Sequence, residues 1–324
     1  MSRPTLRPVL VVLLAFALAG GLAACGASGG DGIAEEGAGP QATESTSAAS
    51  DVPDEVDAPG TTSDPTAERS DVDCTPEGLA EEDGTEFVLA HQVVDGELGV
   101  TCFGEDDEVL FAAWDDLRAI TPPDQLNDLA AFAGFTSSEG GDEETLAYVL
   151  NLDGEGDTFL MAINLDAYES DRDQALLTIA HEFSHVFTLL PSQVDRSDAA
   201  YESCDTYLTD EGCFRPDSLI AAWIDEFWSD AELATLDPDE EASGAGGEER
   251  CATDPGFFGP YAASNPEEDF AESFSAYVFD VPTETPEQQA RVDWLADQPG
   301  LVEFRERAVD ADLAPIDWLF EPCG

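Results

Sequence analysis

The stretch LLTIAHEFSHVF, residues 176–187, decides the fold of this chain. Its apolar side chains recur at three- and four-residue intervals, a pattern typical of a buried amphipathic helix. Ser170 or Asp171 can cap the start of this helix, and Pro191 stops it. We therefore expect one long helix here, around which the rest of the domain is organised.

Two histidines lie one turn apart on this helix. His181 and His185 are at positions i and i+4, so both imidazoles share a face and can bind one metal ion. Glu182 follows the first histidine, where its carboxylate can take a proton from a water molecule that the ion activates. Two unrelated surface histidines are the alternative, but the chain contains only three histidines in all. The pattern predicts a zinc site.

A catalytic zinc normally has three protein ligands and one open position. No histidine follows His185, and His91, which stands in no motif, is interpreted as a core or surface residue. A carboxylate is therefore expected, and the segment YAASNPEEDFAESF, residues 261–274, supplies the candidates. Spacing favours Glu268, and the alternatives that remain open are Glu267, Asp269 and Glu272.

Glu268 also has a purely structural interpretation. With Asn265 as N-cap and Pro266 as the first helical residue, Glu268 falls at the third position, where its side chain can complete a capping box. The spacing alone does not separate this role from metal binding.

The motif HEFSH, followed by Tyr-x6-Glu-x-Phe-Ala-Glu-x-Phe, resembles the catalytic domain of anthrax lethal factor and its relatives. These proteins, which include secreted Pro-Pro endopeptidases, are gluzincin metallopeptidases. The resemblance covers about residues 140–282. It departs from the family in the long, acidic, cysteine-containing stretch between His185 and Glu268, and residues before 140 match no motif of the family.

The resemblance implies a function for each matched residue. His181, His185 and Glu268 become the ligands of one Zn²⁺, and Glu182 becomes the general base of peptide hydrolysis. Tyr261 becomes a phenol that stabilises the oxyanion, and Glu272 a carboxylate bonded to a ligand imidazole. In such enzymes the strand before the metal helix often pairs with an extended substrate, which here points to Thr158–Leu165.

The other elements predict an α+β fold, a zincin-like metallopeptidase domain that is mostly helical with a small mixed sheet before the HExxH helix. Thr145–Leu152 and Thr158–Leu165 form an expected hairpin, whose Asp153–Asp157 turn could bind Ca²⁺ but lacks the full EF-hand pattern, so a plain turn is favoured. Strand or mixed structure is expected over Phe87–Phe103. Helices are expected over Val109–Ile120, Gln125–Phe132, Leu219–Trp228, 265–278 and, as one or two, 286–310.

The N-terminus reads as an export signal. Residues 1–24 combine Arg3 and Arg7 with a short apolar run, and they end in LAAC, where Cys25 resembles a bacterial lipidation site. An ordinary cleaved signal with an incidental cysteine is the alternative. Residues 25–72 hold almost no large apolar side chains, so they form a disordered acidic tether to a domain at 73–324. We expect a monomer on the outer face of the bacterial cell membrane, anchored there by lipidated Cys25.

Six cysteines remain beyond Cys25, an even number that indicates disulfides in an exported chain. Fifteen pairings are open. Proximity in the sequence favours Cys74–Cys102 and Cys204–Cys213, which leaves Cys251–Cys323.

The charge excludes several classes of function. The chain has 72 acids and 11 bases, all arginine, for a net charge of −61; the part from Cys74 onward holds 60 acids and 8 arginines, a net charge of −52. Such a surface cannot hold a nucleic-acid backbone, and the lack of lysine excludes P-loop and Schiff-base chemistry.

We expect a membrane-anchored zinc endopeptidase acting on peptide or protein substrates. The alternatives are a non-proteolytic metal-binding or adhesive lipoprotein and a purely structural envelope protein.

Overall fold

A computed structural model describes residues 74–75, 79, 87–137, 145–153, 155–236, 247–318 and 320–323. The expected signal segment 1–24, the lipidation site Cys25 and the tether over 25–72 lie outside the described residues. Within the part that the structure describes, no helix has the length and apolar character needed to cross a membrane.

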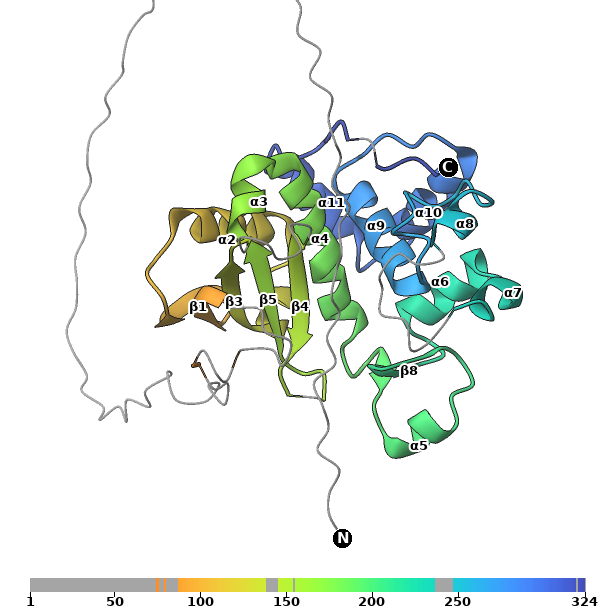
Figure 1. Cartoon of the computed structure of the whole chain (residues 1–324), viewed down its shortest axis with the longest axis horizontal. Coiled ribbons are helices and arrows are strands. Elements are labelled where there is room, and N and C mark those ends of the chain that lie inside the picture. The colour runs from red at the N-terminus through yellow and green to blue at the C-terminus, as the bar shows by residue number, and fades with distance from the viewer. Residues whose placement is uncertain are drawn as a thin grey trace, which may run out of the picture. The chain divides into compact units, whose positions relative to one another are not determined.

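Five strands form one mixed sheet in the order β2-β1-β3-β5-β4 (Figure 1). Their bounds are β1 Phe87–Val94, β2 Glu97–Phe103, β3 Leu129–Phe135, β4 Ala147–Asn151 and β5 Phe159–Asn164. Strands β3 and β5 are parallel and the other neighbours are antiparallel. All five strands precede the histidine helix, so the predicted α+β class with a small mixed sheet is confirmed.

The predicted helix over Gln125–Phe132 is wrong. A single 3₁₀ turn, η1 (Gln125–Asp128), leads directly into strand β3. Strand β3 lies in the middle of the sheet and is buried along almost its whole length. A strand buried on both faces has no polar alternation, and its continuous apolar run cannot be distinguished from a buried helix by periodicity.

The predicted hairpin over Thr145–Leu165 is confirmed as β4 and β5. The connecting turn folds around Asp153, whose Oδ1 accepts hydrogen bonds from the backbone N–H groups of Glu155 and Gly156, each at 2.8 Å. The Thr158 hydroxyl donates to the other carboxylate oxygen at 2.8 Å. Because donors of the turn itself occupy both oxygens, these contacts support the plain turn over a calcium loop.

Three helices, α2 (Glu108–Ile120), α3 (Leu165–Ser170) and α4 (Arg172–Thr188), pack against one face of the sheet (Figure 1). Asp171 caps α4 by accepting from the backbone N–H of Gln174, as predicted. Small and apolar side chains of the opposite face pack together with buried Leu79 in a second cluster. A disulfide joins Cys74 to Cys102 on the edge strand β2, and so holds the start of the domain beside the sheet.

Helix α4 lies between the sheet and the C-terminal helices (Figure 1). The further elements are β6 Val194–Asp195, α5 Asp198–Glu202, β7 Leu208–Thr209, β8 Gly212–Phe214, α6 Leu219–Phe227, α7 Asp230–Leu233, α8 Gly247–Cys251, α9 Pro266–Val278, α10 Pro286–Ala296 and α11 Val302–Asp310. Strands β6, β7 and β8 form a small second sheet that the sequence did not predict. The expected helices over 219–228, 265–278 and 286–310 are confirmed, the last as two helices.

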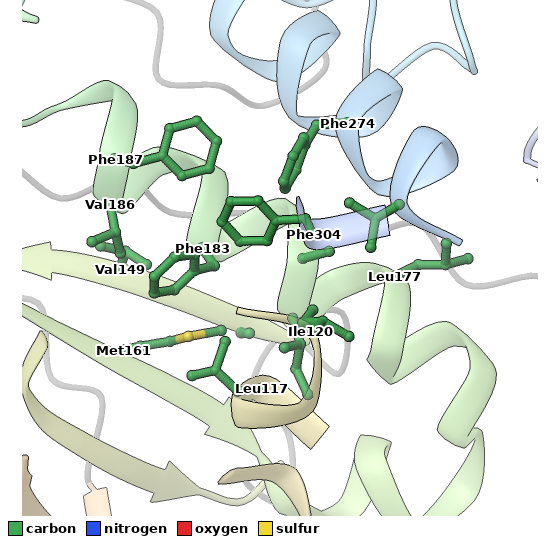
Figure 2. Packing of buried hydrophobic residues seen from close by; sticks show 14 of the residues in the cluster. Leu117, Ile120, Val149, Met161, Leu177, Phe183, Val186, Phe187, Phe274 and Phe304 are labelled. Atoms are coloured by element: carbon green, nitrogen blue, oxygen red, sulfur yellow. The ribbon is translucent and has the colours of Figure 1, made fainter. Parts of the chain in front are cut away.

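Aromatic side chains join α4 to the C-terminal helices (Figure 2). The Phe187 ring lies 5.3 Å from the Phe274 ring of α9, and Phe304 of α11 lies 5.1 Å from Phe274. On the sheet side, α4 meets Val149 and Met161 in the same core. Buried on both sides, α4 is fixed against the sheet and α9 alike, and this rigidity sets the positions of its histidines.

All three predicted disulfides are present. Cys74 pairs with Cys102, Cys204 with Cys213, and Cys251 with Cys323. The second pair closes the hairpin after α4, and the third holds the C-terminal segment against α8.

Candidate metal centre

Helices α4 and α9 bring together the three predicted ligands. The Nε2 atoms of His181 and His185 are 3.2 Å apart, and a carboxylate oxygen of Glu268 lies 2.9 Å from the first and 3.6 Å from the second. All three residues are buried. Two histidines and a carboxylate thus converge on one point in the interior, as the HExxH spacing and the downstream helix predicted.

The start of α9 determines where Glu268 points. Asn265 is the N-cap and Pro266 the first helical residue, both as predicted. The backbone N–H of Glu268 donates to Asn265 Oδ1 at 2.9 Å, which satisfies one of the free donors of the first turn. The carboxylate of Glu268, however, reaches His181. The cap therefore orients the backbone, and the side chain serves the cluster of histidines rather than a capping box.

The residues present fit a zinc ion. Two histidines and one glutamate form one of the ligand sets of catalytic zinc, with bonds of about 2.1 Å. Tetrahedral ligands at that bond length are about 3.4 Å apart, by geometry from the same bond length. The separations of 3.2, 2.9 and 3.6 Å between the three ligand atoms lie around that spacing. The structure therefore shows a group that could hold a metal ion, and its chemistry suits zinc.

Unpartnered polar atoms surround this group. Both carboxylate oxygens of Glu182 are buried without a hydrogen-bond partner, and the hydroxyl of Tyr261 is buried close to the Glu268 carboxylate. The Tyr261 ring lies 5.8 Å from the His181 ring. Buried polar groups are nearly always paired, because an unpaired one costs about 1–3 kcal/mol. Their concentration here indicates a place made for a ligand that supplies the missing partners.

The electrostatics of the site favour a cation. Burial by itself lowers the pKa of His181, but hydrogen bonds with Glu268 and Glu272 outweigh it and raise that pKa well above 6.5. Burial would raise the pKa of Glu268, yet the charges of His185 and His181 and their hydrogen bonds hold it below its usual range. Burial raises the pKa of Glu182 to about 8. The carboxylates around the two histidines therefore stabilise a positive charge there, whether it comes from a proton or from a metal ion.

The other candidates for the third ligand have different partners. Glu272 Oε1 lies 3.5 Å from His181 Nδ1, the ring nitrogen that faces away from the cluster, as the resemblance implied. Burial raises the pKa of Glu267 to about 7, although a hydrogen bond with Tyr207 acts to lower it. Asp269 accepts hydrogen bonds from Trp223, Trp228 and Arg291. Of the four acids, Glu268 is the one whose oxygen meets both histidines.

Two further features of the site were not predicted from the sequence. Arg250 of α8 donates to the backbone carbonyls of Ala263 and Ser264, at 2.6 Å each, and so supports the turn between Tyr261 and α9. The contacts of Asp269 form a second support. Neither has a local sequence signal, because the partners are distant in the chain. His91, the remaining histidine, is buried on β1 with its Nε2 3.6 Å from Asp106, outside the cluster.

Comparison with known proteins assigns neither a family nor a function to this site. No protein-family model, no curated protein and no solved structure matches the chain. What can be concluded about the site therefore rests on the distances, the burial and the chemistry of His181, His185, Glu268, Glu182 and Tyr261.

Proposed function

We propose that this protein is a zinc-dependent endopeptidase whose active site is centred on the His181, His185 and Glu268 cluster. The observation that carries the proposal is the pairing of a possible metal-binding triad with a buried, unpartnered Glu182 on the same helix. A protein that only stores or carries metal needs the ligands but has no use for such a base. The motif resemblance to the lethal-factor peptidases supports the same reaction.

The chain's own residues divide the work as follows. His181 Nε2, His185 Nε2 and a Glu268 oxygen would hold the ion. When bound, zinc would supply Lewis acidity that polarises the substrate carbonyl and makes water more acidic. The carboxylate of Glu182 takes a proton from the attacking water as the oxygen–carbon bond forms. It then passes the proton to the nitrogen as the carbon–nitrogen bond breaks.

Tyr261 supplies the stabilising donor. Burial and the nearby carboxylates of Glu268, Glu182 and Glu272 raise the pKa of Tyr261 well above 10.0, so its hydroxyl keeps its proton. A protonated phenol can donate a hydrogen bond to the oxygen that becomes negative in the transition state. The hydroxyl lies buried close to the Glu268 carboxylate and keeps the proton that this donation requires.

The expected substrate strand needs a correction. Thr158–Leu165, predicted to pair with an extended peptide, corresponds to β5, which already pairs with β3 on one side and β4 on the other. Strand β4 (Ala147–Asn151) is the edge of the sheet and packs against α4. Extended peptides add to edge strands. The proposal therefore assigns substrate pairing to β4, and the acidic surface would favour cationic peptides at low ionic strength.

We place the enzyme outside the cell, tethered by lipidated Cys25. Three disulfides support an oxidising compartment. The test of the function is hydrolysis of a denatured protein substrate by the zinc-loaded chain, with Glu182→Gln as the matched control. Cleavage by the parent chain and none by the variant supports the proposal, whereas equal rates or no cleavage by either refutes it.

A further inference from the structure

A buried ion pair lies directly beside the metal cluster. Asp269, the residue after Glu268, is fully buried, and its carboxylate accepts from Arg291 Nε of α10 at 3.0 Å. The indole N–H groups of Trp223 and Trp228 donate to the same carboxylate at 2.9 and 3.0 Å. A carboxylate with three buried donors is held firmly, and it fixes the first turn of α9 relative to α6 and α10.

Arg291 also binds a second segment of the site. Its Nη2 lies 3.4 Å from Asp254 Oδ2, and its guanidinium stacks on the Phe257 ring with its central carbon 4.7 Å from the ring centre. The other oxygen of Asp254 accepts from the backbone N–H of Gly256 at 2.8 Å. A Cβ at Gly256 would come within 1.7 Å of the guanidinium, so the loop passes in direct contact with Arg291.

This loop leads to Tyr261, and the opposite side of Arg291 leads to Glu268. The guanidinium therefore spans the two segments that carry the candidate phenol and the third ligand. Arg291 is 2% exposed and Asp269 is fully buried, so their contact is shielded from bulk water, whereas the Asp254 side chain is 27% exposed. Neither Asp254, Asp269 nor Arg291 is part of the metal-binding group itself.

We propose that Arg291, with Asp269 and Asp254, forms a clamp that positions Glu268 for zinc and Tyr261 for the substrate carbonyl. The clamp rests on the proposed function, because it has this role only if the cluster binds zinc. Its two arms serve different steps: Asp269 governs metal binding through α9, and Asp254 governs turnover through the Tyr261 loop. All three are positioning residues, since none touches the ion or the reacting atoms.

Removing each charge in turn distinguishes positioning from a simple field effect. Asp269→Asn removes a negative charge near the cluster, and Arg291→Gln removes a positive one. If the clamp positions Glu268, both variants bind zinc about tenfold more weakly, the lower end of the loss seen when partners behind metal ligands are removed. If it acts only through its electric field, Arg291→Gln binds zinc more tightly while Asp269→Asn binds it more weakly. The proposal is overturned if the two variants change zinc affinity in opposite directions, or if neither variant changes it.

The arm at Asp254 has its own readout. Asp254→Asn should leave zinc affinity unchanged and lower kcat at saturating zinc, because it loosens the loop that carries Tyr261 but not α9. An unchanged kcat overturns this half of the clamp. A variant that merely loosened the fold would not separate zinc affinity from kcat in this way.

Trp228→Phe serves in case the charge variants do not fold, because it removes one donor to Asp269 and keeps an aromatic ring in place. It should weaken zinc binding in the same direction by a smaller factor, and unchanged affinity overturns the clamp. Arg172→Gln is an ion-pair control: it breaks the 2.6 Å ion pair with Asp116 at the start of α4, where the Arg172 side chain is 54% exposed. Its zinc affinity should equal that of the parent chain, and an equal loss there shows that any broken ion pair has this effect.

Zinc affinity is measured by competition with a chromophoric chelator, using the full chain with its three disulfides intact. If the parent chain binds no zinc, the proposed function fails and the clamp with it. If the parent chain binds zinc and the clamp variants bind it equally well, the function stands and the clamp alone is refuted.

Discussion

The Nε2 atom of His181 lies 2.9 Å from a carboxylate oxygen of Glu268, although α4 and α9 are separated in the chain by the β6–β8 sheet and helices α5 to α8. The contact exists because α4 is packed on both sides and α9 begins with a well-formed cap. Two helices fixed in this way present their ligands with little freedom, so less ordering is needed when a metal ion binds.

Glu268→Ala should abolish zinc binding, because two imidazoles alone leave the ion without its third protein ligand. Glu272→Gln should weaken binding about 10- to 100-fold, since Glu272 supports His181 from its Nδ1 side. Zinc content after dialysis and chelator competition measure both. Retention of zinc by the alanine variant would assign the third ligand elsewhere.

Glu182→Gln should keep zinc and lower kcat by about 10²- to 10⁴-fold, the range for loss of a general base. The amide matches the carboxylate in shape but cannot take the proton. Metal content and turnover on a denatured protein are measured on the same sample. Unchanged turnover with zinc present excludes Glu182 from the reaction.

Tyr261→Phe should lower kcat by about 10²- to 10³-fold, the usual loss for one oxyanion donor, and leave zinc affinity and KM nearly unchanged. The substitution removes only the buried hydroxyl and keeps the aromatic ring in place. A large rise in KM with normal kcat would instead make Tyr261 a substrate-binding residue.

The local features of the site could be predicted from the sequence because helix periodicity and caps are local signals. The i,i+4 histidines, the Asn265 cap and the Asp171 cap all follow from short stretches. The disulfide pairing could also be predicted, because two of the three bridges join cysteines that are close in sequence.

Features that depend on distant parts of the chain could not be predicted. Strand β3 was mistaken for helix because its burial on both faces removes alternation. Substrate pairing was expected at Thr158–Leu165, but the strand order, which tertiary pairing sets, places β5 between β3 and β4. The Asp269 contacts with Trp223 and Arg291 join three helices, and no spacing rule connects them.

Tyr168 should contribute to the pH dependence of stability at alkaline pH. Burial and the hydrogen bond to Asp116 raise the pKa of Tyr168 from 10.0 to about 12. Unfolded Tyr168 therefore loses its proton first, so its stabilising contribution is complete below pH 10 and is lost as pH rises toward 12. Denaturant unfolding of the parent chain and Tyr168→Phe should show a difference that shrinks over this window. Parallel curves would remove Tyr168 as the cause.

The third disulfide should contribute more stability than the second. Cys251–Cys323 closes 72 residues and Cys204–Cys213 closes nine. By loop entropy, the losses on replacing each pair with serine are about 4 and about 3 kcal/mol in the free energy of unfolding. Urea denaturation of the two double variants measures them. A larger loss for the short loop would show that local packing, rather than chain entropy, dominates.

Anomalous diffraction at the zinc absorption edge, from crystals of the zinc-loaded chain, examines the metal centre most directly. We predict one strong peak about 2.1 Å from His181 Nε2 and His185 Nε2, and at a similar distance from a Glu268 oxygen. A peak on other residues, or none at this cluster with zinc in excess, would refute the metal centre and the peptidase function that depends on it.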